Sequence, residues 1–194
     1  MSTIYKYALY TVVFFLTATG FSQVKKEYEK RISEADFPAE ALSLISPFKK
    51  EFNRLKYYKE SDGDNQSFEA KFKYESSHYS VEFNNEGKLE DVELKLSKNK
   101  LPKALWEAIK LNLDSNYERW KLEKLQCQYS HINNPKETLE KALNKTQTKQ
   151  ENYELIVAIK QKGKLKKMEI LFNARGEVLN RRDILRRSYD FLIF

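Results

Sequence analysis

The chain repeats one pattern of strands and turns, and this repeat constrains the fold more than any other feature. Residues 153–182 read YELIVAIKQKGKLKKMEILFNARGEVLNRR, which is three strand-like segments around two tight turns. Residues 68–96, FEAKFKYESSHYSVEFNNEGKLEDVELKL, follow the same pattern. Apolar and polar residues alternate in both, as is typical of strands with one buried and one solvated face. The repetition predicts one supersecondary unit that is used twice.

A helical segment precedes the strands in each copy. Phe37-Pro38 and Leu101-Pro102 each place a proline where a helix can begin. Pro47 interrupts the first helical segment and predicts a kink or two short helices. Apolar residues recur at helical spacing after both prolines: Ala41, Leu44, Ile45, Phe48 and Phe52 in the first copy, and Leu105, Ala108, Ile109 and Leu113 in the second.

These patterns predict an α+β fold, a tandem repeat of a helix packed on an antiparallel β-sheet. The first repeat is expected over residues 23–97 and the second over 98–194. Residues 131–150 have no counterpart in the first copy and form a polar insert. Within it, Asn134 can cap a short helix that carries Leu139 and Leu143 on one side.

The N-terminus has the composition of a signal peptide. Lys6 is the only charged residue before Lys25, and residues 8–19 form an apolar run that is short for a membrane span. Gly20 and Ser22 place small residues at a cleavage site, so we expect a cleaved signal peptide over residues 1–22. The mature protein is then periplasmic or secreted. An uncleaved anchor is the alternative.

The chain offers few residues for catalysis or metal binding. It contains one cysteine, Cys127, and two histidines, whereas a metal site usually needs three or four converging ligands. Cys127 is expected to be a core residue and His131 a loop residue. Residues 62–65 resemble the start of a calcium loop but depart from it at later positions, and they predict a hairpin turn. We therefore expect no enzymatic activity, no catalytic or metal site and no cofactor.

The one marked charge feature is basic and lies near the C-terminus. Residues 160–187 contain ten Lys or Arg and three acidic residues. Such a cluster can contact an acidic protein, anionic lipid or polyanionic glycan. It can equally be a solvated hairpin that lysines protect from edge-to-edge association. The candidate partner-binding residues are Lys162, Lys164, Lys166, Lys167, Arg181 and Arg182.

The repeated unit resembles the PepSY-like domains, a group that includes β-lactamase-inhibitor-like proteins of bacterial envelopes. The resemblance is carried by residues 37–38, 79–83, Gly87 and 89–92 in the first copy, and by residues 101–102, 168–172, Gly176 and Val178 in the second. It implies two copies of a helix on an antiparallel sheet. It also implies proteins that bind other proteins, some of them as inhibitors of peptidases or β-lactamases.

The sequence thus predicts an exported, non-enzymatic protein-binding module, inhibitor-like or sensor-like. Its expected partner is an envelope or secreted protein. The alternative is a cationic binder of anionic lipid or glycan that acts through the basic C-terminal third. Nucleic acid is not an expected partner of an exported protein, and after signal cleavage we expect no integral membrane segment.

Overall fold

A single β-sheet runs through the described chain, which in this computed structural model comprises residues 24–25, 27–62, 65–130 and 133–184. The strand order is β1-β10-β9-β8-β7-β6-β5-β4-β3-β2. Every neighbouring pair is antiparallel except β1 and β10, which are parallel. The α+β class with an antiparallel sheet is therefore confirmed. The signal-peptide prediction lies outside the described residues.

The strands are β1 Val24–Lys25, β2 Glu27–Ile32, β3 Asn53–Asp62, β4 Asn65–Tyr74, β5 Ser77–Asn84, β6 Leu89–Lys95, β7 Arg119–Tyr129, β8 Asn152–Gln161, β9 Lys164–Phe172 and β10 Val178–Ile184. The α-helices are α1 Ala39–Ile45, α2 Lys103–Asn116 and α3 Pro135–Leu143. Short 3-10 helices are η1 Glu34–Asp36, η2 Ser46–Glu51 and η3 Lys98–Lys100. The sequence prediction of two short helices around Pro47 is met by α1 and η2.

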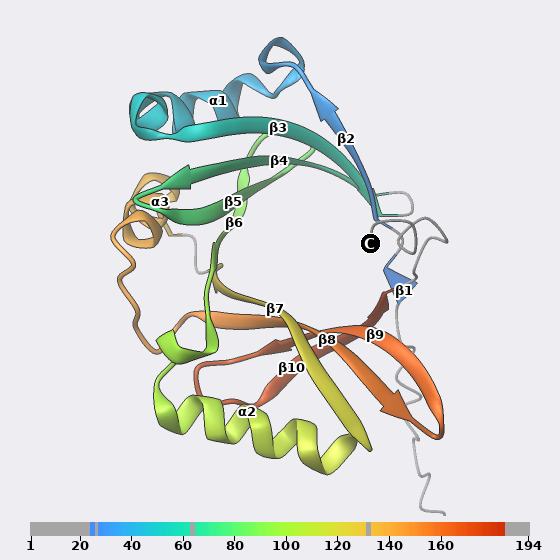
Figure 1. Ribbon diagram of the computed structural model, residues 1–194. Coiled ribbons are helices and arrows are strands. Elements are labelled where there is room, and N and C mark those ends of the chain that lie inside the picture. The colour runs from blue at the N-terminus through green and yellow to red at the C-terminus, as the bar shows by residue number, and fades with distance from the viewer. Residues whose placement is uncertain (1–23, 26, 63–64, 131–132, 185–194) are drawn as a thin grey trace, which may run out of the picture.

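The sheet curls strongly, and the helices lie on its outer side (Figure 1). Strands β1 and β2 are adjacent in the sequence, yet they form opposite edges of the sheet. Val24 pairs with Asp183 of β10, while Glu27 pairs with Asp62 of β3. Since so short a piece of chain serves both edges, the sheet must curve until its edges approach each other.

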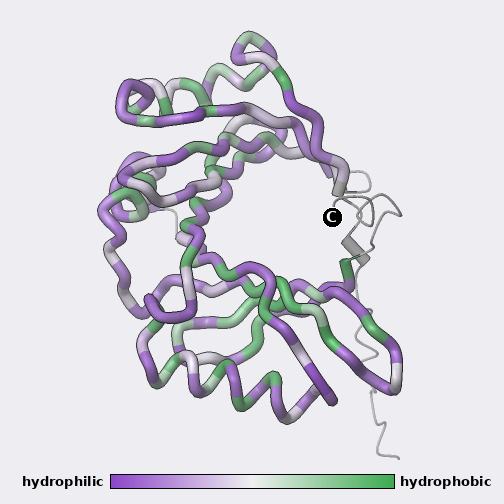
Figure 2. Tube along the Cα trace, in the orientation of Figure 1, coloured by the Kyte–Doolittle hydropathy of each residue, from purple (hydrophilic) through white to green (hydrophobic). Residues whose placement is uncertain are grey.

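The convex face of the sheet is apolar and forms the core with the helices. Hydrophilic and hydrophobic residues alternate along the strands (Figure 2), so each strand sends alternate side chains to the two faces. The fully buried side chains of the convex face include Val81 and Phe83 of β5, Leu155 and Val157 of β8, and Ile170 and Phe172 of β9. Ala41 and Ile45 of α1, and Ile109 and Leu113 of α2, complete this core.

The polar insert contributes a helix to the same core. Asn134 Oδ1 accepts hydrogen bonds from the backbone amides of Lys136 and Glu137, at 3.1 and 3.3 Å, so the predicted cap of α3 is confirmed. Leu139 and Leu143 are buried, as their spacing predicted. The Tyr79 hydroxyl of β5 lies 3.4 Å from the Ala142 carbonyl oxygen and donates to it. Helix α3 therefore packs against β5, which ends more than fifty residues before it in the chain.

Two turn glycines let the helices approach the sheet closely. Gly87 has φ +85° and Gly176 has φ +80°. A Cβ on Gly87 would lie 2.7 Å from the Pro38 Cβ at the start of α1. A Cβ on Gly176 would lie 2.7 Å from the Ala108 Cβ of α2. Both glycines are thus required by backbone conformation and by space.

Alanine substitution of these two glycines is expected to destabilise the fold more than substitution of Gly163. Gly163 also has positive φ (+73°), but a Cβ there would meet nothing within 4 Å. Gly163→Ala should lower the free energy of unfolding by about 1 kcal/mol through backbone strain alone. Gly87→Ala and Gly176→Ala add steric overlap and should cost about 3 kcal/mol each. Urea denaturation of the three variants measures the difference, and equal losses would contradict the close approach.

Candidate functional site

The concave face of the sheet is lined by polar and charged side chains that are largely buried. They alternate with the core residues along the same strands and therefore point to the inner side of the curl. The buried members are Glu69 of β4, Ser80 of β5, Asp91 and Glu93 of β6, Gln126 of β7, Glu154 of β8 and Glu169 of β9. Burial of this many carboxyl groups is unusual and requires compensating contacts.

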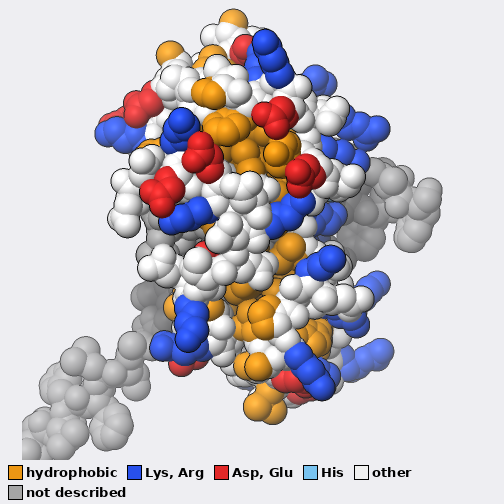
Figure 3. Space-filling model, turned by 90° about the vertical axis from the view of Figure 1, so that its left-hand side faces the viewer, with side chains coloured by type: hydrophobic (Ala, Val, Ile, Leu, Met, Phe, Trp, Pro, Cys, Tyr) orange, Lys and Arg blue, Asp and Glu red, His pale blue; other side chains and the backbone are white. Residues whose placement is uncertain are grey.

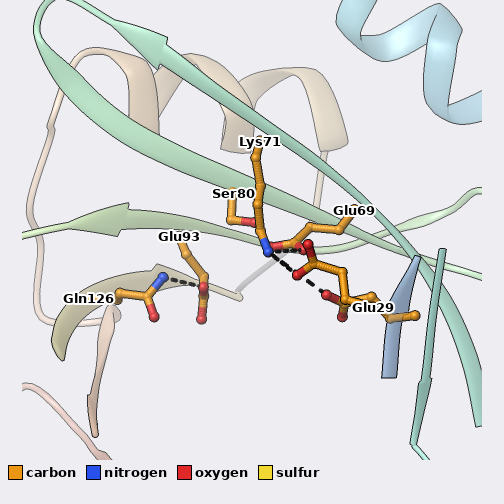
Figure 4. Close-up of polar contacts among 7 residues, drawn as sticks. Glu29, Glu69, Lys71, Ser80, Glu93 and Gln126 are labelled. Atoms are coloured by element: carbon orange, nitrogen blue, oxygen red, sulfur yellow. Dashed lines mark hydrogen bonds and ion pairs between the residues drawn. The ribbon is translucent and has the colours of Figure 1, made fainter. Parts of the chain in front are cut away.

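One group of carboxylates is neutralised by a lysine. Lys71 Nζ lies 2.5 Å from Glu29 Oε2, 2.6 Å from Glu69 Oε2 and 4.0 Å from Glu60 Oε1. Ser80 Oγ also donates to Glu69, so side chains from β2, β4 and β5 converge here (Figure 4). Burial disfavours the charged lysine, but Glu69 and Glu29 outweigh burial and raise the pKa of Lys71. This group is an ion-pair network held together by one ammonium.

A second group has three carboxylates and no such cation. Oxygen atoms of Glu82, Asp91 and Glu93 all lie within 4.8 Å of one another. Among the described residues no Lys or Arg forms an ion pair with any of the three. Two of them contact neutral amides instead: Gln128 Nε2 donates to Asp91 Oδ2 at 2.9 Å, and Gln126 Nε2 donates to Glu93 Oε2.

Burial and mutual repulsion make these three carboxyl groups hard to ionise. Burial is the main cause that raises the pKa of Asp91 to about 7, and the charge of Glu154 adds to it. Burial followed by the charge of Asp91 holds the pKa of Glu82 well above its usual range. For Glu93, burial followed by Glu154 has the same effect on the pKa. The protonated form is thus favoured at these three carboxyl groups, whereas the ammonium of Lys71 compensates the charge of the first group.

A cationic pocket opens at one end of the same face. The pocket has a volume of about 340 Å³, and its lining comes from β3, β4, β5, β6 and β7. Ser80, Glu69 and Gln126 are buried residues of the lining. Six basic side chains surround it: Arg54, Lys56, Lys71, Lys73, Lys95 and Lys124. All of them except Lys71 form no ion pair with a carboxylate in the described part of the chain.

The positive charge of this pocket acts on the histidine that lines it. Desolvation lowers the pKa of His78, and the charges of Lys73, Lys95 and Arg54 lower it further. Like charges also face each other across strands, since Lys56 pairs with Lys71, and Lys73 pairs with His78. Such pairs destabilise a sheet, so this accumulation of charge opposes folding.

Arg54 lies in an irregular stretch of β3 beside the pocket. The register of β3 against β4 shifts between Asn53 and Lys56, and Arg54 has φ +58°. A non-glycine residue with positive φ is strained, and β-bulges often redirect a side chain near a functional site. The bulge adds Arg54 to the basic residues that line the pocket.

The structure does not bring the six predicted basic residues together into one patch. Lys162 and Lys164 are exposed at the β8–β9 hairpin. Lys166 and Lys167 point to opposite faces of β9 and pair with Asp183 at 2.9 Å and Glu123 at 2.7 Å. The other two are held by neighbours: Arg181 donates to Asn112 Oδ1 at 3.1 Å, and Arg182 pairs with Glu169.

Sequence reasoning missed the cationic pocket. Its lysines alternate with apolar residues along several strands, and this pattern by itself predicts a solvated face. One sequence signal points to the pocket. The predicted hairpin at residues 62–65 joins two strands, and it places the basic residues Arg54 and Lys56 of one strand near Lys71 and Lys73 of the other. Only pairing with β6 and β7 adds Lys95 and Lys124.

The single cysteine takes the place that the sequence predicted. Cys127 is fully buried on β7, on the apolar face. Burial raises the pKa of its thiol to about 12, so the thiol stays protonated near neutral pH. His131 lies outside the described residues.

A second hollow lies on the outer surface. It is a groove of about 580 Å³ between α1 and α3, lined by Leu44, Pro47 and Leu89 among others. On this side of the molecule hydrophobic side chains gather in the upper part, beside several Asp and Glu side chains (Figure 3). The groove and the cationic pocket are thus on different faces of the sheet.

The fold is that of several solved proteins of Bacteroides. A DUF2874 family protein from Bacteroides ovatus is 16% identical over 80% of this chain and 93% of that chain, with a TM-score of 0.51. A DUF2874 family protein from Bacteroides uniformis is 13% identical over 80% and 94%, with a TM-score of 0.52. A Bacteroides eggerthii protein assigned to the periplasm is 11% identical over 80% and 94%, with a TM-score of 0.50. At these identities the likeness shows the fold alone.

No known family profile matches the sequence, and no curated protein matches it. None of the helices in the described ranges combines the length and the apolar composition that crossing a lipid bilayer requires.

The carboxyl group of Asp91 makes stability depend on pH. Folding raises its pKa to about 7, so between about pH 4 and pH 7 the folded chain keeps a proton that the unfolded chain releases. The free energy of unfolding should therefore fall as the pH rises through this window. Charges of Glu154, Glu69 and Glu90 act on Asp91 in the same direction, and the amide of Gln128 opposes them.

Asp91→Asn should remove this contribution. Relative to the unmodified chain, the variant should gain about 2–4 kcal/mol more stability at pH 8 than at pH 5. Chemical denaturation at both pH values, in buffer free of divalent cations, measures the gain. Glu107→Gln, on the exposed side of α2, is the control and should leave the pH dependence unchanged. Identical pH profiles for Asp91→Asn and the control would contradict the assignment.

Proposed function

We propose that this chain is an exported, non-enzymatic protein-binding module that holds an acidic segment of its partner in the cationic pocket. The observation that carries the proposal is the set of basic side chains around the pocket that have no carboxylate partner among the described residues. Arg54, Lys56, Lys73, Lys95 and Lys124 come from four strands and surround one cavity. A partner that brings carboxylates would relieve their mutual repulsion.

The energetics favour an acidic partner over a neutral one. Lysines that pair across the sheet repel one another, and this repulsion is a cost of folding. Carboxylates that enter the pocket replace this repulsion with ion pairs. Because the site is partly desolvated, these ion pairs are stronger than ion pairs at an open surface. Because the rim of the pocket is exposed, the interaction should weaken as salt is added.

Export supports the choice of partner. The leader-like residues 1–22 predict secretion or a periplasmic location, and the Bacteroides eggerthii protein with this fold is assigned to the periplasm. We propose the same location for this chain. An envelope or secreted protein with an acidic segment is then the expected partner.

We further propose that residues 23–97 and 98–194 are two copies of one PepSY-like unit. Two features support this. Asn84 and Asn173 make the same hydrogen bonds within their turns, where each Oδ1 accepts from the backbone amides two and four residues later. Gly87 and Gly176 also make the same close approach to α1 and α2. An inhibitor-like or sensor-like role follows from that resemblance and stays a prediction.

The rival function is a cationic binder of anionic lipid or glycan through the C-terminal basic residues. Its strongest support is the β8–β9 hairpin, where Lys162 and Lys164 are exposed. The two proposals place the binding charges at different sites and can be separated by paired charge reversals.

Charge reversal in the pocket should weaken binding of an acidic peptide, and the same reversal at the hairpin should not. The probe is a fluorescent hexaglutamate peptide, with hexaglutamine as its neutral control. Lys73→Glu with Lys95→Glu should weaken hexaglutamate binding by at least about tenfold, which corresponds to about 1.4 kcal/mol. Fluorescence anisotropy at moderate salt, in the presence of a chelator, measures the affinity of both double variants.

Lys162→Glu with Lys164→Glu is the matched control, because it changes the net charge by the same amount. It should change peptide affinity by less than about twofold at moderate salt, since screening limits distant charges. Equal losses in both double variants would contradict the pocket. The rival function would be favoured if only the hairpin variant lost binding to anionic vesicles or to a sulfated glycan.

A further inference from the structure

The concave face contains two clusters of three carboxylates, and only one of them is neutralised. In the first, Glu29, Glu60 and Glu69 surround the ammonium of Lys71. In the second, Glu82, Asp91 and Glu93 have no basic partner in the described ranges. The first cluster shows how this fold stabilises three converging carboxylates, namely with a positive charge among them. The second cluster has the same need, and no ion pair within the described ranges meets it, although the charge of Lys124 acts on Glu93.

The geometry of the second cluster fits one metal ion. Glu82 and Asp91 pair directly across β5 and β6, and Glu93 lies two residues further along β6 on the same face. One oxygen from each lies within 4.8 Å of the others. Calcium binds oxygen at about 2.3–2.6 Å, so two of its ligands can be up to about 4.6–5.2 Å apart. A single ion can therefore contact all three without displacement of the strands.

Two buried oxygen atoms at this place accept no hydrogen bond from the part of the chain that the structure describes. Asp91 Oδ1 is one, and Asp91 is 8% exposed. The other is Oε1 of Gln126, a residue outside the acidic cluster that is 4% exposed. The Gln126 amide N–H donates to Glu93, so the side chain of Gln126 lies directly beside that of Glu93 (Figure 4). A buried acceptor without a donor is rare and indicates an ion or a proton that completes it.

We propose that Glu82, Asp91 and Glu93, with the amide oxygen of Gln126, bind a divalent cation of the calcium type. All four ligand atoms are oxygens, which hard cations prefer and which zinc or copper sites seldom use alone. Calcium accepts irregular sets of carboxylate and amide oxygens, whereas magnesium requires near-octahedral geometry. Water would complete the coordination.

This proposal does not depend on the proposed function. The cation site lies beside the pocket, since Gln126 also lines the pocket. Acidic-peptide binding is measured with chelator present, so either proposal can fail alone.

Calcium should stabilise the chelator-treated protein. Addition of CaCl₂ should raise the melting temperature by about 5–10 °C once calcium exceeds the dissociation constant about a hundredfold. Isothermal titration calorimetry should give one calcium ion per chain. MgCl₂ at the same concentration should give a smaller shift, and KCl at matched ionic strength should give none.

Substitution at the ligands should abolish this response without unfolding the chain. Glu82→Gln with Glu93→Gln removes two buried carboxylates and keeps their shape, so the variant should fold and lose the calcium-induced shift. Glu29→Gln, in the lysine-bridged cluster, is the matched control and should keep the full shift.

Three outcomes would overturn the proposal. The first is no calcium-dependent shift in the unmodified protein, which would leave protons as the means of neutralising the cluster. The second is a shift that the Glu82→Gln, Glu93→Gln variant retains, which would place calcium elsewhere. The third is an equal loss in the Glu29→Gln control, which would indicate a general effect of acidic charge.

Discussion

Among the described residues, the inner face of the sheet buries carboxylates that no lysine or arginine pairs with, and the rest of the structure must accommodate this imbalance. A buried charge without compensation costs several kcal/mol. Lys71 compensates Glu69 and its neighbours, and Arg182 pairs with Glu169. Asp91 and Glu93 contact amides, and the pKa of each of the carboxyl groups Glu82, Asp91 and Glu93 rises instead. This face is consequently the part of the molecule whose stability responds most to protons and cations.

The outer face provides the stability that makes such an inner face possible. Helices α1, α2 and α3 cover the convex side, and the core of the sheet is formed there. Gly87 and Gly176 allow α1 and α2 to lie close to the ends of the hairpins. Burial of apolar surface on one side therefore fixes the curvature of the strands, and the curvature encloses the polar side chains on the other.

Charges of opposite sign are segregated along the inner face. Basic side chains gather around the pocket near Lys73 of β4 and Lys95 of β6, while Glu82 and Asp91 lie further along β5 and β6. The described residues alone satisfy neither cluster, because among them unpaired cations remain around the pocket and unpartnered oxygens remain at the carboxylates. Sites that oppose folding in this way are where proteins commonly bind ligands. The inner face thus contains two separate sites, one for the proposed anionic partner and one for the proposed metal ion.

The sequence by itself determined the local structure of this protein. The alternation in residues 68–96 and 153–182 gave the strands, Pro38 and Pro102 marked the helix starts, and Asn134 capped α3 as its position predicted. These features depend on neighbours a few residues away. The sequence did not reveal that the polar face would be enclosed, because alternation distinguishes two faces without telling whether the second one meets water. Only the tertiary structure brings Gln126 of β7 against Glu93 of β6 and curves the sheet around them. It also separates the basic residues of the C-terminal third, which are close together only in the sequence. Pairings between strands that lie thirty or more residues apart decide such sites, and no local pattern records them.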